Sequence, residues 1–150
     1  MTKKKPKHRF TPSGTKKPRI STPEEQLFKW RTDYADLADH GWGWGTISIR
    51  DFFKGMAKKL HEFDGWSWAR SVSEDIAHFF NPSDIADTAQ IRLRELVNEN
   101  VVPEELLGEE LTGIRYTGRA RIWGFKVRGC FYLLWWDPKH TVYPVSKKHT

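Results

Sequence analysis

An apolar run of seven residues near the end of the chain, Cys130 to Trp136, constrains the fold more than any other segment. The run is far shorter than the roughly 20 residues that a membrane-spanning helix needs. A continuous apolar run of this length, followed by turn residues such as Asp137-Pro138, is typical of a buried strand. We therefore expect residues 130–136 to form the central strand of a sheet that helices cover on one face.

Further strands are predicted around this run. Residues 119–127 alternate in character, with Arg119, Arg121 and Trp123 among the odd-numbered positions, as in a half-exposed strand. The connection through Arg128-Gly129 is short enough for a hairpin. The predicted strands are residues 109–116, 119–127, 130–136 and 141–145.

Helical periodicity fills the preceding part of the chain. Thr22-Pro23-Glu24-Glu25 has capping-box spacing and predicts a helix that continues to about Ala38. Ser48 is expected to cap a second long helix, and Asn81-Pro82 to open another that ends near Asn98. The glycine-rich loop 41–45 carries two tryptophans, which we interpret as a turn held to the core by its indoles, with base stacking as the alternative.

Together these patterns predict an α+β fold, with N-terminal helices followed by a C-terminal antiparallel β-meander of about four strands. Residues 21–150 are expected to form a single domain, with a helical part at 21–100 and a sheet part at 106–146. Residues 1–20 are expected to be a disordered basic tail, because they carry eight Lys or Arg, no acid and little apolar surface.

The charge is distributed unevenly along the chain. Residues 21–110 are acidic, whereas residues 111–150 carry eight Lys or Arg against the single acid Asp137. Such asymmetry usually reports partners rather than fold. The one cysteine cannot form an intramolecular disulfide, and no apolar stretch resembles a signal peptide or a membrane span. We expect a cytoplasmic protein that does not contact membrane.

The basic residues of the predicted sheet suggest a nucleic-acid interface. Guanidinium groups bind phosphate through a bidentate fork, and an indole offers a face on which a base can stack. The alternative is a solvated face whose cations pair with the acidic helices. The residues expected to bind nucleic acid are Arg115, Arg119, Trp123, Lys126, Arg128, Lys147 and Lys148.

Three residues near the end of the sheet are candidates for catalysis: Arg121, His140 and Tyr143. Cleavage of RNA by its own 2′-hydroxyl needs a proton acceptor, a proton donor and cations that stabilise the phosphorane charge. His140 follows a turn opened by Asp137-Pro138, so a purely structural role in that turn is the alternative. Scattered histidines, a lone cysteine and the absence of phosphate-cradling or dinucleotide motifs predict no metal site and no small-molecule cofactor.

The C-terminal half also resembles known small bacterial proteins. The resemblance covers about residues 76–150 and rests on the blocks Arg121-Ile122-Trp123-Gly124, Leu133-Leu134-Trp135-Trp136-Asp137-Pro138-Lys139-His140 and Val142-Tyr143-Pro144. Similar blocks occur in uncharacterised proteins of bacterial genomes and mobile elements. The predicted order of elements is similar to that of RelE/HigB-type toxins of toxin-antitoxin pairs.

This resemblance implies a function. Most RelE-like proteins are messenger-RNA endonucleases that act on the ribosome, whereas a ParE branch poisons DNA gyrase. The resemblance implies that Arg121 corresponds to the arginine that binds phosphate in these toxins. It also implies that His140 or Tyr143 corresponds to the residue near their C-terminus that acts as general acid or base. The chain differs from compact toxins in its extra N-terminal region of about seventy residues.

The favoured hypothesis is a toxin-like, metal-independent endoribonuclease of a type II toxin-antitoxin pair, acting on messenger RNA either free or on the ribosome. Its expected partners are RNA, the ribosome and a cognate antitoxin. The alternative is a non-catalytic accessory module of phage or mobile-element origin that binds nucleic acid or protein.

Overall fold

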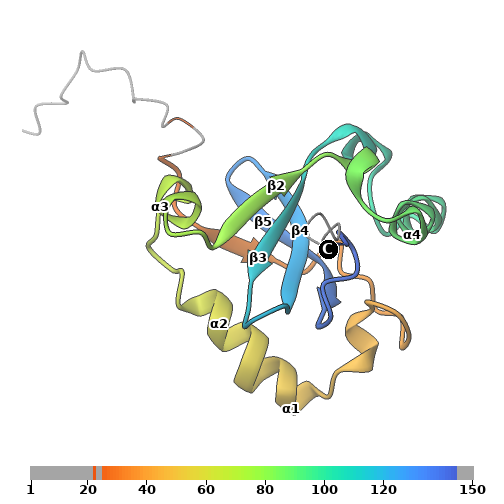
Figure 1. Cartoon of the computed structure of the whole chain (residues 1–150), viewed down its shortest axis with the longest axis horizontal. Coiled ribbons are helices and arrows are strands. Elements are labelled where there is room, and N and C mark those ends of the chain that lie inside the picture. Colours follow the sequence, from red (N-terminus) through yellow and green to blue (C-terminus); the bar gives the residue numbers. More distant parts are fainter. Residues whose placement is uncertain (1–21, 23–24, 145–150) are drawn as a thin grey trace, which may run out of the picture.

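The computed structural model describes Thr22 and residues 25–144 (Figure 1). The predicted disordered tail over residues 1–20 lies outside the described residues, as do Lys147 and Lys148.

The centre of the molecule is a five-stranded mixed sheet with the order β1-β5-β4-β3-β2. The strands β2 to β5 pair antiparallel, whereas β1 pairs parallel with β5. Their bounds are Lys29–Arg31 for β1, Ala77–Phe80 for β2, Leu111–Arg115 for β3, Arg121–Val127 for β4 and Cys130–Asp137 for β5.

This topology corrects the predicted fold. The expectation of N-terminal helices followed by a four-stranded antiparallel meander of the RelE-like kind is wrong, because β1 and β2 come from the region predicted to be helical and one strand pair is parallel. The predicted strand at 141–145 is also wrong as far as it is described, since Thr141 to Pro144 follow β5 without pairing. The central strand is β4, and β5 lies between β4 and β1.

The first predicted helix is replaced by the edge strand β1. In this strand Lys29 and Arg31 are exposed and Trp30 is half-buried, the alternation of a strand rather than of a helix. Leu37, which the helical pattern placed on an apolar stripe, is 77% exposed. Pairing with β5, about a hundred residues away, therefore outweighs the local spacing.

The second predicted helix is confirmed. It is a continuous helical segment made of α1 (Ile49–Asp51), a π-helical turn (Phe52–Ala57) and α2 (Lys58–His61). Ser48 caps it, since its hydroxyl accepts a hydrogen bond from the Asp51 amide at 3.0 Å.

Two further helices follow. The short helix α3 (Trp68–Ser73) is capped by Ser67, and α4 (Asp87–Asn98) forms the predicted later helix, beginning after a separate 3-10 turn at Pro82–Asp84. Other 3-10 turns lie at Trp44–Thr46 and Glu104–Gly108. None of the helices in the described part of the chain is long and apolar enough to cross a membrane.

The sheet is buried on both faces, not on one as predicted. Figure 1 shows α1, α2 and α3 on one side of the strands and α4 on the other. Leu93 and Leu96 of α4 pack with Trp123 and Trp135 on one face, and Leu60 of α2 and Trp68 of α3 pack on the other. The tryptophans of loop 41–45 join these cores, which confirms their interpretation as anchors.

Asp36 ties the N-terminal region to α4 and β5. Its carboxylate accepts hydrogen bonds from Arg92 Nε and Nη2, both at 2.9 Å, and from Trp135 Nε1 and the Ala38 amide, both at 3.1 Å. The Arg92 guanidinium also donates to Glu95 Oε2 at 2.9 Å, so it bridges the buried Asp36 and an exposed carboxylate of α4. Burial raises the pKa of Asp36, and the bonds from Arg92, Ala38 and Trp135 outweigh that effect and leave the pKa below its ordinary value.

We predict that Asp36→Ala destabilises the protein by about 3 kcal/mol, since it removes the acceptor of four hydrogen bonds and leaves the buried Trp135 Nε1 without a partner, although Arg92 keeps its pair with Glu95. Because the folded-state pKa is lowered, the contribution of Asp36 is fully present above its unfolded pKa of about 3.9 and is lost as the pH falls through the folded value. Urea unfolding between pH 7 and pH 2 measures both effects. The exposed Asp39→Ala variant is the control, and a loss as small as that of Asp39→Ala contradicts the prediction.

Candidate functional site

A pocket of about 280 Å³ opens at the end of the sheet where β3 turns into β4. Residues of β2, β3 and β4 that share one face form its floor, because alternate residues of a strand point the same way and the register aligns His78, Gly113 and Trp123. The segment after β5 closes it. We call this site the arginine–histidine pocket; its lining residues are His78, Phe80, Gly113, Arg115, Arg121, Trp123, His140 and Tyr143.

Two arginines lie side by side in this pocket. Arg115 and Arg121 are paired across β3 and β4. Burial and the positive charge of Arg115 both lower the pKa of Arg121. Arg121 Nη1 donates to the carbonyl oxygens of Gly118 at 2.7 Å and Ala120 at 3.0 Å, and among the described residues no carboxylate forms an ion pair with it. Two neighbouring cations with incomplete compensation favour the binding of an anion.

Asp75 lies at one side of the pocket, in the turn between α3 and β2. Its Oδ2 accepts a hydrogen bond from Arg115 Nη2 at 3.0 Å, and its Oδ1 lies 3.0 Å from His78 Nε2. A single carboxylate therefore orients an arginine and a histidine together.

His140 is held in an unusual backbone conformation. Its φ is +58°, in the left-handed region that residues other than glycine rarely adopt. The carboxylate of Asp137 fixes this turn by accepting hydrogen bonds from the Thr141 amide and hydroxyl, the Val142 amide and Trp123 Nε1 at 2.9–3.2 Å. Asp137 therefore opens the turn, as predicted, and also anchors it in the core, where the side chain is buried.

Two buried nitrogen atoms in the pocket lack a hydrogen-bond partner: Arg115 Nε and His140 Nδ1. A buried polar group left without a partner costs about 1–3 kcal/mol, so such atoms are uncommon in folded proteins. Both nitrogens belong to residues that line the same pocket as Arg121, whereas the three other unpartnered buried atoms of the described residues, in Gln26, Trp44 and Thr112, belong to residues outside its lining.

Aromatic rings form the remaining wall. Phe80 and Tyr143 have ring centroids 4.5 Å apart, and the Trp123 ring lies between Phe80 and His140, with centroid distances of 5.1 Å and 6.4 Å. Trp123 is 0% exposed, so the expected role of its indole as a stacking surface for bases does not fit the structure. Trp123 instead supports the pocket floor.

The structure brings together five of the residues singled out from the sequence and separates others. The five are Arg115, Arg121, Trp123, His140 and Tyr143. Arg119 is exposed in the turn between β3 and β4, and Arg128 in the turn at the other end of β4. Lys126 Nζ lies on the opposite face, 4.9 Å from the centre of the Trp68 ring.

His78 and Phe80 are pocket residues that sequence reasoning missed. The signal for them was the aromatic pair Phe79-Phe80 before the turn residues Asn81-Pro82, a pattern typical of a short strand. Their segment is β2, which pairs with β3 and so places His78 and Phe80 in the lining of the pocket.

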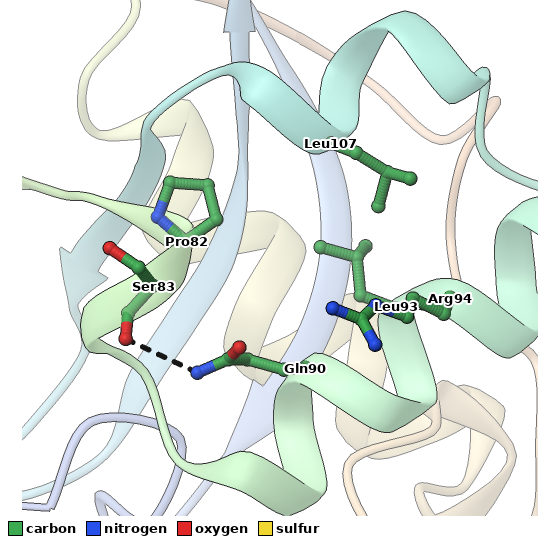
Figure 2. Close-up of a pocket in the computed structure, with 6 residues that line it drawn as sticks. All are labelled: Pro82, Ser83, Gln90, Leu93, Arg94 and Leu107. Atoms are coloured by element: carbon green, nitrogen blue, oxygen red, sulfur yellow. Dashed lines mark hydrogen bonds between the residues drawn. The ribbon is translucent and has the colours of Figure 1, made fainter.

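A second pocket of about 270 Å³ lies between α4 and the 3-10 turns at 82–84 and 104–108 (Figure 2). Gln90 Nε2 donates to the Ser83 carbonyl at 3.2 Å and to the Ile85 carbonyl at 2.9 Å. Arg94 is the one charged residue of its lining, beside Leu93 and Leu107, and none of the unpartnered buried atoms belongs to it. The arginine–histidine pocket is therefore the stronger candidate site.

Among Thr22 and residues 25–144, no three His, Cys, Asp or Glu side chains are grouped as metal ligands would be. Comparison with protein-family models, curated proteins and solved structures finds no match to this chain.

Proposed function

We propose that the arginine–histidine pocket binds a phosphodiester of single-stranded RNA and cleaves it by attack of the adjacent 2′-hydroxyl, without a metal ion. The observation that carries this proposal is the meeting of two arginines and a histidine in the lining of one pocket of about 280 Å³. Arginine forks match the geometry of phosphate oxygens, and cations held in place stabilise charge that develops on phosphorus.

Proton abstraction and phosphate binding each have a candidate group in the pocket. His140 takes the proton of the 2′-hydroxyl while the oxygen bonds to phosphorus, and Arg115 and Arg121 bind the two non-bridging oxygens. The bond from phosphorus to the 5′-oxygen breaks, and that oxygen receives a proton. The products are a 2′,3′-cyclic phosphate and a 5′-hydroxyl, so no water, oxidant or reductant is consumed.

Incubation of the purified protein with end-labelled RNA in the presence of a chelator tests the proposal. We expect cleavage to cyclic-phosphate ends, and no cleavage at a position where a single 2′-deoxynucleotide replaces the ribonucleotide. Parallel reactions with and without ribosomes measure ribosome dependence. Equal cleavage of the 2′-deoxy substrate, or ends other than cyclic phosphate, contradicts 2′-hydroxyl attack.

In the cell this activity fits the role of a cytoplasmic toxin with a cognate antitoxin. Induced expression of the chain is expected to arrest translation, and loss of the pocket arginines to relieve the arrest. Continued arrest by variants that no longer cleave RNA indicates a different mode of action.

A second candidate, a non-catalytic module that binds an acidic protein, is favoured by an exposed apolar pair on the long helical segment. Ile49 is 78% and Phe53 65% exposed, and the neighbouring Arg50, Lys54 and Lys58 form no ion pair with a described residue. Under this alternative, substitutions in the arginine–histidine pocket leave cellular activity unchanged, whereas Phe53→Ser abolishes it.

A further inference from the structure

We propose that His78, positioned by Asp75, is the general acid that protonates the departing 5′-oxygen, and that His140 is the general base. This assignment rests on the proposed RNA cleavage and completes it, because the leaving oxygen otherwise lacks a proton donor.

The backbone places His78 within the pocket beside the phosphate-binding arginines. His78 lies on β2 opposite Gly113, and Gly113 in turn lies opposite Trp123. A Cβ atom at Gly113 would come within 3.2 Å of the Trp123 ring, so glycine keeps the floor between these residues open. His78 and His140 thus both line the pocket that contains Arg115 and Arg121.

The two histidines have different electrostatic surroundings. His78 Nε2 lies 3.0 Å from Asp75 Oδ1 and 3.3 Å from the Asp75 carbonyl oxygen, so Asp75 orients the ring through this nitrogen. With Nε2 engaged there, Nδ1 is the nitrogen left to donate a proton to a ligand. His140 has no ion pair with a described carboxylate, and its Nδ1 is buried without a partner.

These surroundings match the opposite demands of the two roles. An acid must enter the reaction with its proton, whereas a base must enter without one. Asp75 holds His78 Nε2 by its carboxylate, whereas His140 has no carboxylate partner among the described residues, so the two rings are held in different ways at the same pocket.

Asp75 is itself held in the left-handed region, with φ +61°. Its carboxylate bridges His78 and Arg115, so it couples the proton donor to a phosphate-binding group. Asp75 touches no reacting atom in this scheme and acts as a positioning residue. Asparagine is among the residues that best tolerate this backbone conformation, so Asp75→Asn removes the charge with little change in shape.

The test compares two RNA substrates, one with the normal 5′-oxygen at the scissile bond and one with sulfur in its place. A thiolate leaves without protonation, because the pKa of a thiol is about 8.5 and far below that of an alcohol. We expect His78→Ala to slow cleavage of the normal substrate by about 100-fold or more and cleavage of the sulfur substrate by less than about 5-fold. We expect His140→Asn to slow both substrates equally.

Asp75→Asn is expected to slow the normal substrate by about 10-fold and the sulfur substrate by less, because loss of the Arg115 partner acts on both substrates and loss of the His78 partner only on the normal one. The ratio of the two rates within one protein preparation does not depend on the folded fraction, so partial misfolding does not obscure the result. His78→Gln serves as a second variant of similar size.

His61→Ala is the matched control, since His61 also pairs with an aspartate three residues away, Asp64, at 2.9 Å but lies on α2 outside the pocket. Its two rates should match those of the parent. If the parent cleaves RNA and His78→Ala slows both substrates equally, the acid assignment is wrong while the proposed function stands. If the parent cleaves neither substrate, both fail.

Discussion

Replacing His140 with asparagine is expected to slow RNA cleavage by about 100- to 10,000-fold, the range over which a general base contributes. Asparagine tolerates the left-handed backbone at this position, whereas alanine adds strain to the loss of the imidazole. The turn should therefore stay in place, because its hydrogen bonds run from Thr141 and Val142 to Asp137.

Single-turnover cleavage of a short RNA by His140→Asn and the parent, at equal protein concentration and with thermal unfolding recorded for both, measures this effect. Added imidazole is expected to restore part of the rate in the variant, because the vacated space admits a small base. A variant within about 3-fold of the parent removes His140 from the proposed chemistry.

Arg121→Met is expected to lower cleavage by about 100- to 1,000-fold, as the loss of one group that stabilises transition-state charge typically does. The same change should leave the protein at least as stable as the parent. Burial and the neighbouring Arg115 lower the pKa of Arg121, so the folded state carries an electrostatic penalty that methionine, with a similar apolar stem, relieves.

This combination of lost activity and retained stability separates a binding residue from a structural one. Cleavage rate and urea unfolding of Arg121→Met are compared with those of Arg94→Met, an arginine that lines the other pocket of similar size. The control should keep both properties. Loss of stability in Arg121→Met by about 2 kcal/mol or more indicates that Arg121 holds the β3–β4 turn rather than a ligand.

The strands β4 and β5 could largely be predicted from the sequence, because the residue pattern within each strand is enough to identify it. The apolar run at 130–136 and the alternation that includes Arg121 and Trp123 correspond to β5 and β4. Likewise, the helix predicted to end near Asn98 corresponds to α4, whose buried residues are Ala89, Leu93 and Leu96.

The N-terminal strands could not be predicted, because they depend on pairing between segments far apart in the chain. Three residues of β1 suffice for pairing with β5. The local sequence around them fits a helix by chance, and only the pairing with β5 shows that they form a strand. The strand β2 has only four residues, and no strand was predicted at His78.

The site was predicted in part, since strand alternation shows which residues share a face but not how deep each one lies. Arg121 and Trp123 share a face as expected, whereas Arg119 lies in the turn before β4 and does not line the pocket. Phe80, His140 and α4 cover the indole. Burial of Trp123 follows from elements that pack on the sheet, and no pattern within β4 itself reports it.

The central claim is that Arg115, Arg121 and His140 together bind the phosphate of a single strand. NMR titration of the protein, labelled at arginine and histidine, with a single-stranded DNA oligonucleotide that lacks the 2′-hydroxyl tests it directly. We expect saturable shifts of the Arg115 and Arg121 Nε–Hε signals and of the His140 ring, with the Arg94 and Arg128 signals unmoved. Shifts confined to arginines outside the pocket, or no saturable shift at Arg121, would contradict it.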